Sequence, residues 1–317
     1  MRFVAATHNI MDGRLCRELL QHYSRLGSTV NHPVGMINVQ ENVIVTSSAA
    51  PLLSVPLQSR RHQCDEVVTN EIQTQVTTTC ADLIARTLGV EYSVASDTTK
   101  DPRLATVYNS RLFELVESKI VELPRLSSLP TWNKLFIKSG QVEQKHALVC
   151  DFVPNNNTPG TPIVLRNINF HLDAAGNNQH RKRQMASLLS VMAAPSAIDL
   201  ASAPNHHIVS GDTNIFHMSN SVQQDVLQSA IESLSPFVSL LASDGQELNL
   251  DSPTHFFSRA NEPTMIHQAG VFVGKHFGID LPQCYDVVLT NLQVCDRGQV
   301  ATPDCSDHDL VFATLVV

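Results

Sequence analysis

Positive charge is scarce in this sequence. Its 317 residues include 22 Lys and Arg against 30 Asp and Glu, a formal net charge of −8. A protein that coats DNA without sequence preference is normally basic, so this balance argues against that class, although an enzyme could still meet nucleic acid through one local basic patch. Aromatic residues make up only 5% of the chain, and no platform for base stacking is evident. No run of 18 uncharged apolar residues occurs, which excludes a membrane-spanning helix.

Paired cysteine motifs and a secretory leader are also missing. The seven cysteines are widely scattered and include no C-x-x-C pair, so neither a structural zinc site nor a disulfide framework is favoured. Near the N-terminus, the apolar stretch 3–6 is too short for the core of a signal peptide. Reduced thiols and the lack of a leader predict a cytoplasmic or nuclear protein.

Hydrophobic residues make up 43% of the chain, enough for a large core. Val68, Cys80 and Leu88 lie on one face of a predicted helix that ends at Gly89, and a second helix is predicted over 178–192. Because both chain ends look like sheet strands, we expect one mixed α/β domain over residues 1–317. Strand-like runs cover 2–9, 35–41, 92–95, 104–108, 113–121, 135–137, 147–153, 163–172, 207–212, 284–289 and 310–316.

Several of these apolar runs end on acids, amides or histidines. Glu41 and His171 each end one run, Asp212 ends another, and Asp307 with His308 comes just before the last. A carboxylate after a strand is more often a cap or turn residue, and a single histidine there is more often structural. Polar groups gathered at one edge of a sheet can nevertheless form a site on a rigid scaffold. The ordered combination is therefore the informative feature.

That combination resembles the endonuclease/exonuclease/phosphatase superfamily, which has the DNase I-like fold. The resemblance implies a four-layer α/β sandwich of two mixed β-sheets flanked by helices, with the site at one end. It also implies divalent-metal-dependent hydrolysis of a phosphate ester. The matching segments run in the family's order, namely Ala6-Thr-His-Asn9, Val39-Gln-Glu41, Asn169-Phe-His-Leu-Asp-Ala174, Gly211-Asp-Thr-Asn214, Tyr285-Asp-Val-Val-Leu289 and Ser306-Asp-His308.

The resemblance also implies a metal site. Glu41 offers the hard carboxylate oxygen that suits Mg²⁺, with Mn²⁺ as an alternative ion. Asn9 matches a family residue beside that metal, although it could simply tie down the end of the first strand. Asp307 is a further candidate ligand, either directly or through water.

The remaining matches imply roles in catalysis. Asp212 is the candidate base for the attacking water, and Asn214 could donate its amide to a phosphate oxygen. His308 would contact the phosphate while Asp286 holds its imidazole. His171 could protonate the leaving oxygen or stabilise the transition state, and the sequence does not decide which histidine is the acid.

Two arginines are candidate substrate contacts. Arg61 lies in a loop beyond Glu41 where family members often meet substrate, and Arg181 lies in the basic cluster 180–183 of the predicted second helix, where helix anchoring is an alternative. The leading hypothesis is a phosphodiesterase that acts on a nucleic acid or nucleotide. The alternatives are hydrolysis of inositol phosphates or phospholipids, and a non-catalytic binding protein that keeps the fold. Oligomeric state is not predicted.

Overall fold

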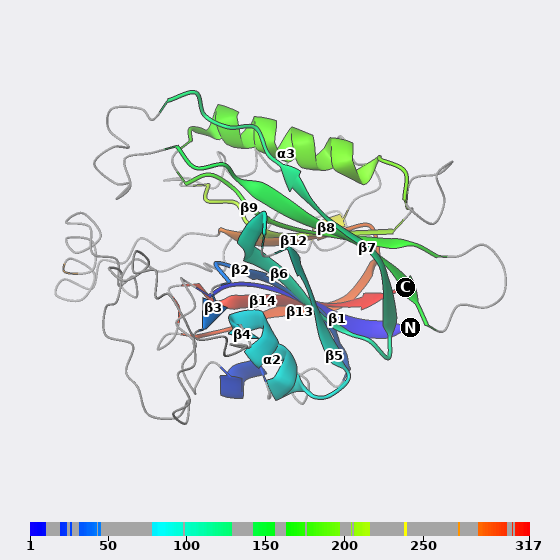
Figure 1. The fold of residues 1–317 in the computed structure, drawn as a ribbon. Coiled ribbons are helices and arrows are strands. Elements are labelled where there is room, and N and C mark those ends of the chain that lie inside the picture. The colour runs from blue at the N-terminus through cyan, green and yellow to red at the C-terminus, as the bar shows by residue number, and fades with distance from the viewer. Residues whose placement is uncertain are drawn as a thin grey trace, which may run out of the picture.

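Two six-stranded β-sheets pack face to face in the computed structural model (Figure 1). The structure describes residues 1–10, 20–23, 26, 32–42, 44–45, 78–97, 99–128, 142–155, 163–174, 176–196, 204, 206–215, 238–239, 272, 285–302, 306 and 308–317. In the first sheet the strand order is β13 (Gln293–Val300), β14 (Leu310–Val316), β1 (Arg2–Asn9), β2 (Val34–Gln40), β6 (Asp101–Asn109) and β5 (Tyr92–Asp97). In the second sheet it is β11 (Val238–Ser239), β12 (Asp286–Thr290), β10 (His206–Asp212), β9 (Leu165–His171), β8 (His146–Pro154) and β7 (Phe113–Glu122).

Both sheets are mixed, and the parallel pair of each lies near its middle. β1 pairs with β2 in parallel, and β9 pairs with β10 in parallel. The other pairings within the two sheets are antiparallel. A separate short ladder joins β3 (Ile44–Val45) to β4 (Thr78–Thr79). The predicted strands that fall on described residues are confirmed, with boundaries shifted by a few residues.

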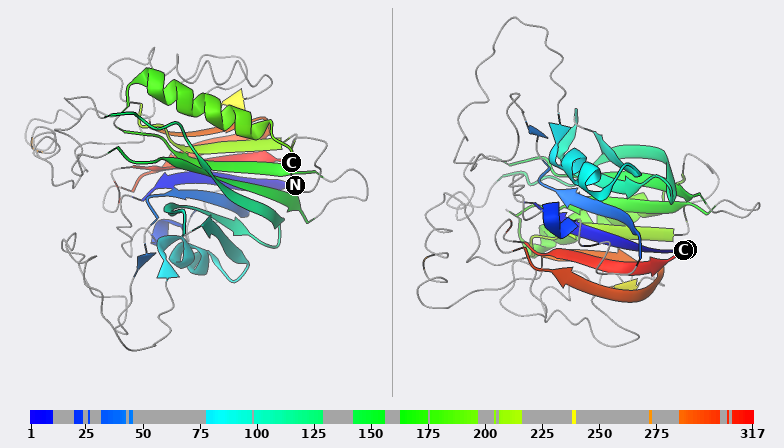
Figure 2. Two further views of the ribbon diagram at one scale, coloured as in Figure 1. Left: turned by 45° about the horizontal axis from the view of Figure 1, so that its top comes forward. Right: turned by 90° about the horizontal axis from the view of Figure 1, so that it is seen from below.

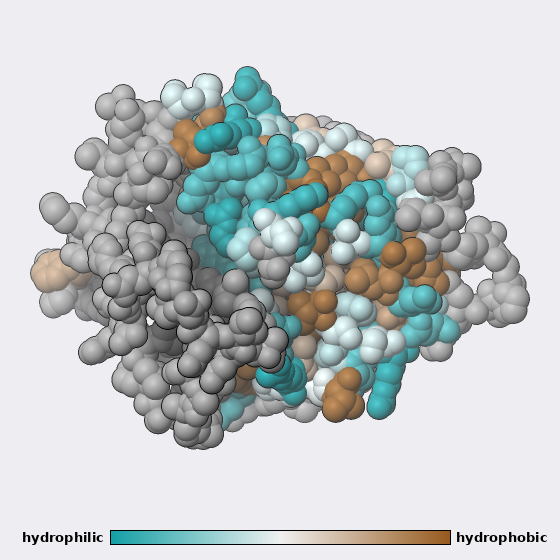
Figure 3. Space-filling view, viewed as in Figure 1, coloured by the Kyte–Doolittle hydropathy of each residue, from teal (hydrophilic) through white to brown (hydrophobic). Residues whose placement is uncertain are grey.

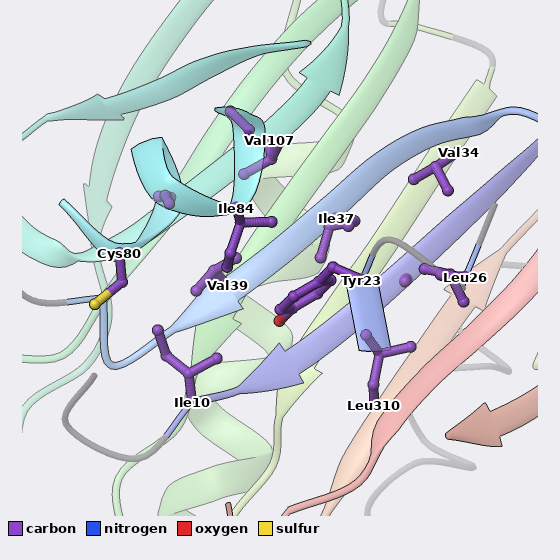
Figure 4. Close-up of a cluster of buried hydrophobic side chains, with 14 of the residues drawn as sticks. Ile10, Tyr23, Leu26, Val34, Ile37, Val39, Cys80, Ile84, Val107 and Leu310 are labelled. Carbon is purple, nitrogen blue, oxygen red and sulfur yellow. The ribbon is translucent and has the colours of Figure 1, made fainter. Parts of the chain in front are cut away.

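Helices cover the outer faces of both sheets. α3 (Asn178–Met192) lies along the outside of the second sheet and α2 (Cys80–Leu88) along the outside of the first (Figures 1 and 2). Ile84 of α2 packs toward Ile37 and Val39 of β2 (Figure 4). The order helix, sheet, sheet, helix is the predicted four-layer DNase I-like sandwich. Among the described residues, no helix is long and apolar enough to cross a membrane.

The start of α2 corrects the sequence prediction. A helical face was predicted from Val68, but Thr78 and Thr79 are extended in β4 and the helix begins at Cys80. The Thr79 side chain accepts from the Asp82 amide, and the Asp82 carboxylate accepts from the Thr79 amide, which is a capping box. These two hydrogen bonds satisfy backbone amides at the helix start, which explains why the chain changes from extended to helical at Cys80. The rest of the predicted segment, 68–77, lies outside the described residues.

β13 was not predicted, and its sequence explains why. Among the described strands it pairs with β14 alone, at the edge of the sheet, and its side chains are mostly exposed. Polar residues such as Asp296 and Arg297 interrupt the apolar alternation that indicates a half-buried strand. On the face shown in Figure 3, hydrophilic and hydrophobic residues of the described chain are similarly interleaved. The predicted run 135–137 lies outside the described residues.

The two termini meet at one end of the sandwich. The amino group of Met1 donates to the carbonyl of Val317 over 2.7 Å. β1 starts beside this contact and ends at Asn9, at the opposite end of the sandwich (Figure 1). The shared direction of the strands in each parallel pair therefore brings the polar strand ends together far from the termini.

Candidate active site

Two parallel strand pairs, one from each sheet, bring the candidate site together. In the first sheet Asn9 lies opposite Gln40, and Gln40 directly precedes Glu41. In the second sheet Asp212 lies opposite His171. Parallel strands end at the same edge of a sheet, which explains how residues so distant in sequence become neighbours.

The Asn9 side chain joins the two halves of the site. Its amide nitrogen donates to Oδ2 of Asp212 over 2.9 Å and lies 3.3 Å from Oε1 of Glu41. Asn9 and Asp212 are buried, whereas Glu41 is only partly buried. One amide therefore holds two carboxylates from opposite sheets, and the Glu41 carboxylate is the one nearer to solvent.

Asp212 is held in the ionised form. Burial raises the pKa of this carboxyl group, but the electrostatic interactions with His308 and His171 and the hydrogen bonds from Asn9 and the Asn214 amide together leave the pKa below its usual value. The Asn214 amide donates to Oδ1 over 2.7 Å. The second oxygen, Oδ2, faces Nε2 of both histidines at 3.7 Å. An oriented carboxylate beside two imidazoles can accept a proton.

The two histidines differ in their surroundings. Burial lowers the pKa of His171 to about 3, and the positive charges of Lys145 and Arg103 contribute, so His171 is neutral near pH 7. Nδ1 of His308 lies 2.7 Å from Oδ2 of Asp286. Because an ionised carboxylate only accepts hydrogen bonds, Nδ1 carries the proton, and Nε2 faces Asp212.

Backbone strain is concentrated in the site. Two described residues other than glycine have a positive φ, namely Glu41 at 57° and Asn214 at 49°. Such conformations cost free energy and are found where the surrounding structure enforces them, often at functional sites. The Asn214 side chain donates to the carbonyl of Leu172 over 3.1 Å, which ties it to the end of β9.

Two sets of contacts that the sequence analysis missed hold Ser306 and His308, just before β14, against β1. The Ser306 hydroxyl donates to the carbonyl of Asn9 over 2.8 Å and accepts from the His308 amide over 3.1 Å. His8 is buried and lies between the Tyr23 hydroxyl, 2.7 Å from Nδ1, and the His308 carbonyl, 3.3 Å from Nε2. Both contacts position His308 relative to β1. The sequence offered one hint of these roles, because His8 lies in the same matching segment as Asn9 and Ser306 in the same segment as His308.

The two predicted arginine contacts have different outcomes. Arg181 is buried, and its guanidinium donates to the carbonyl of Ala174 over 2.9 Å. This contact favours the alternative reading that Arg181 anchors the start of α3. Arg61 lies outside the described residues, as does the candidate metal ligand Asp307.

Acidic groups in the site could hold a cation. Within the described chain, ligand atoms of Asp212, Asp286 and His308 lie within 4.8 Å of one another. All three residues are buried, and the His308–Asp286 hydrogen bond already occupies Nδ1 and a carboxylate oxygen. Glu41, next to Asn9, offers the more accessible hard oxygen. Mg²⁺ typically takes one or two protein carboxylates and keeps several waters, so the Glu41 side of the site fits it better.

Comparison with known proteins supports the fold. No protein-family model matches the sequence, and no curated protein matches it. Three solved structures superpose over essentially the whole of both chains. D. rerio TDP2, complexed with single-strand DNA product, is 12% identical with a TM-score of 0.57 and coverage of 100% of this chain and 99% of that chain. A Bacteroides vulgatus endonuclease/exonuclease/phosphatase is 13% identical with a TM-score of 0.56 and the same coverage.

The third, the Bacteroides thetaiotaomicron mannosyl-6-phosphatase, is 11% identical with a TM-score of 0.53, and the match covers 99% of this chain and 100% of that chain. At such low identities the similarity establishes the fold. The chain therefore has the DNase I-like fold of endonuclease/exonuclease/phosphatase proteins.

Proposed function

We propose that this protein is a divalent-metal-dependent phosphoesterase, and specifically a phosphodiesterase that acts on a nucleic acid or a nucleotide. The observation that carries the proposal is the Asn9 amide, which lies 2.9 Å from Asp212 and 3.3 Å from Glu41. It places a candidate metal ligand beside a candidate base. The fold it shares with TDP2 bound to a DNA product supports the choice of a diester, and the similarity to a mannosyl-6-phosphatase makes a monoester the alternative to test.

Glu41 and Asn9 would hold the Mg²⁺ ion, with Asp307 as a third proposed ligand and Mn²⁺ as a substitute ion. An ion bound there supplies positive charge to the phosphate oxygens and to the leaving oxygen. Glu41 contributes a partly exposed carboxylate, and Asn9 fixes the direction of that carboxylate. The acidic surroundings of Asp212 and Glu41 also attract a cation.

Asp212 is the proposed general base. Its Oδ2 atom takes one proton from the attacking water, the water oxygen forms the new bond to phosphorus, and the bond from phosphorus to the leaving oxygen breaks. His308, held at Nδ1 by Asp286, would in its imidazolium form offer its Nε2 hydrogen to a phosphate oxygen. His171 is neutral near pH 7 and serves as a hydrogen-bonding group on the other side of Asp212. Asn214 and Arg61 are proposed substrate contacts.

Hydrolysis of an activated phosphodiester tests this proposal. Wild type is compared with Asp212→Ala in the presence of Mg²⁺ and of a chelator, and Asp296→Ala serves as the control because Asp296 is an exposed acid on β13, outside the site. Loss of a positioned base should lower turnover by roughly 10²- to 10⁴-fold while Asp296→Ala keeps the wild-type rate. Equal turnover of wild type and Asp212→Ala would refute the role of Asp212.

An activated phosphomonoester is assayed in parallel. Activity on the monoester alone would replace the diesterase proposal with a phosphatase. Absence of turnover on both substrates, together with absence of Mg²⁺ binding by calorimetry, would favour a binding protein that keeps the fold.

A further inference from the structure

Directly beneath the candidate site, polar side chains fill the space between the two sheets. Side chains alternate between the faces of a strand, so a residue two positions before a site residue faces the same way. Thr7 precedes Asn9 in this manner, Asn169 precedes His171, and Ser210 precedes Asp212. We call the whole set the inter-sheet polar layer. Its members, each at most 1% exposed, are Thr7, Asn38, Gln40, Thr106, Asn167, Asn169 and Ser210.

The layer gives way to apolar side chains on the side away from the site. One further step of two residues along the strands leads to apolar side chains such as Ala5, Met36, Leu165 and Ile208, which belong to one buried cluster between the sheets. On β1 and β2 the change occurs at the same register, since Ala5 pairs with Met36 and Thr7 with Asn38. On β9 it lies one residue pair deeper than on β10, since Asn167 pairs with Ile208. This arrangement relates the polar residues to the site end of the sandwich and not to the core as a whole.

Asn169 makes the contacts nearest to the site. Its amide nitrogen donates to the backbone carbonyls of Val39, over 3.0 Å, and Ala105, over 2.8 Å. Its side-chain oxygen accepts from the Gln40 amide over 2.6 Å, and the same Gln40 amide donates to Thr7 over 3.1 Å. One side chain of β9 is therefore attached to both β2 and β6 of the opposite sheet.

A second group of contacts lies one step deeper. The Asn38 amide donates to Oδ1 of Asn167 over 3.0 Å and to the Ser210 hydroxyl over 2.7 Å. The Thr106 hydroxyl and the Asn167 amide donate back to the Asn38 oxygen over 2.7 and 2.8 Å. This group also crosses between the sheets. Asn38 and Asn167 lie one residue pair further from the site than Gln40 and Asn169, whereas Ser210 is paired with Asn169.

We propose that Gln40 and Asn169 are positioning residues, which hold the Glu41 half of the site against the Asp212 half. Gln40 directly precedes Glu41, and Asn169 lies two residues before His171, so their contact is the layer's link closest to both halves. Apolar packing between sheets is non-directional, whereas a bonded amide pair defines one relative position. The catalytic consequence of this inference rests on the phosphoesterase proposal.

The structural part is tested by crystallography of Asn169→Leu beside a matched control, Asn38→Leu. Both changes replace a buried, fully bonded asparagine of the layer by leucine, and they differ in their distance from the site. In Asn38→Leu, the hydrogen bond from Asn9 to Asp212 should remain. In Asn169→Leu it should be lost as the two strand ends separate. An unchanged Asn9–Asp212 contact in Asn169→Leu would overturn the proposal. If that variant does not fold, Gln40→Met takes its place with the same expectation.

The kinetic part uses the same pair of variants, compared at equal folded fraction. Displacement of a reacting group by about 1 Å can lower a rate about 10²-fold, so kcat of Asn169→Leu should fall by roughly 10- to 100-fold with little change in KM. Asn38→Leu should keep kcat within about threefold of wild type, because it lies one layer deeper. Equal losses of kcat in both variants would show that Asn169 has a purely structural role and would overturn the positioning proposal. If wild type itself has no Asp212-dependent activity, the phosphoesterase proposal fails, while the crystal structures still decide the positioning role.

Discussion

The glycine before the candidate base provides a sharp test of how backbone geometry supports the site. Gly211 has a φ of 155°, which side-chain-bearing residues rarely adopt, and it lies opposite Phe170 in the pairing of β10 with β9. A Cβ atom at this position would collide with the backbone carbonyl oxygen of Phe170. That carbonyl belongs to a central strand and cannot rotate away as a flexible side chain could. Gly211→Ala should therefore push Asp212 away from β9.

The substitution Gly211→Ala should affect both the free energy of unfolding and the activity. Unfavourable backbone geometry costs roughly 1–3 kcal/mol, and urea denaturation should show a loss of unfolding free energy in that range. A shift of the Asp212 carboxylate by about 1 Å should lower kcat/KM on the phosphodiester by about 10- to 100-fold.

Gly298→Ala is the control, because its added Cβ would meet the Phe312 ring at an edge strand instead of backbone. It should leave kcat/KM unchanged. A Gly211→Ala protein as stable and as active as Gly298→Ala would refute this reasoning.

Two predictions concern groups outside the site. Arg166 is fully buried and donates to both carboxylate oxygens of Asp151 at 2.7 Å, so Arg166→Met should lower the unfolding free energy by about 3–5 kcal/mol by leaving a buried charge unpaired. Adding Asp151→Leu should recover part of this loss in urea denaturation, and a further loss instead would contradict the ion-pair explanation. Burial raises the pKa of Asp101, but hydrogen bonds and charge from Arg103 and a hydrogen bond from His146 leave this pKa below its usual value. Asp101 thus adds stability that is fully present above about pH 4 and is lost as the pH falls through its lowered pKa. The midpoint of thermal unfolding, measured between pH 5 and 2.5, should therefore depend less on pH in Asp101→Asn than in wild type. Identical slopes would contradict that role.

The sequence predicts those parts of the fold where periodicity is strong. The strand over 310–316 agrees with β14 residue for residue, because this run is almost entirely apolar. The helix over 178–192 also agrees with α3, although residues 178–184 are polar and the start is marked by the Asn177 cap. The start of α2 was misplaced, since apolar spacing continues across Thr79 and only the cap marks the boundary. β13 was missed because an exposed edge strand buries too few side chains to leave an alternating pattern.

For the site, motif order was enough to name the residues but not to describe their contacts. The strand ends at Asn9, Asp212 and His171 could be predicted, and the structure brings these residues together. The link between Gln40 and Asn169 joins residues 129 positions apart across two sheets. No local spacing encodes that contact. The polar residues two positions before His171 and Asp212 nevertheless indicated that polar side chains continue along the strands beneath the site.

The division of the site between two sheets gives a physical reason for the buried amides beneath it. Within each sheet, backbone hydrogen bonds fix the alignment of Asn9 with Gln40 and of Asp212 with His171. Among the described strands, no backbone ladder joins the two sheets at this point, so the 2.9 Å contact between Asn9 and Asp212 depends on side chains. Well-packed apolar residues in place of bonded buried polar groups are often as stabilising or more so. Stability alone therefore does not account for amides at this depth, whereas the proposed positioning of the two half-sites does.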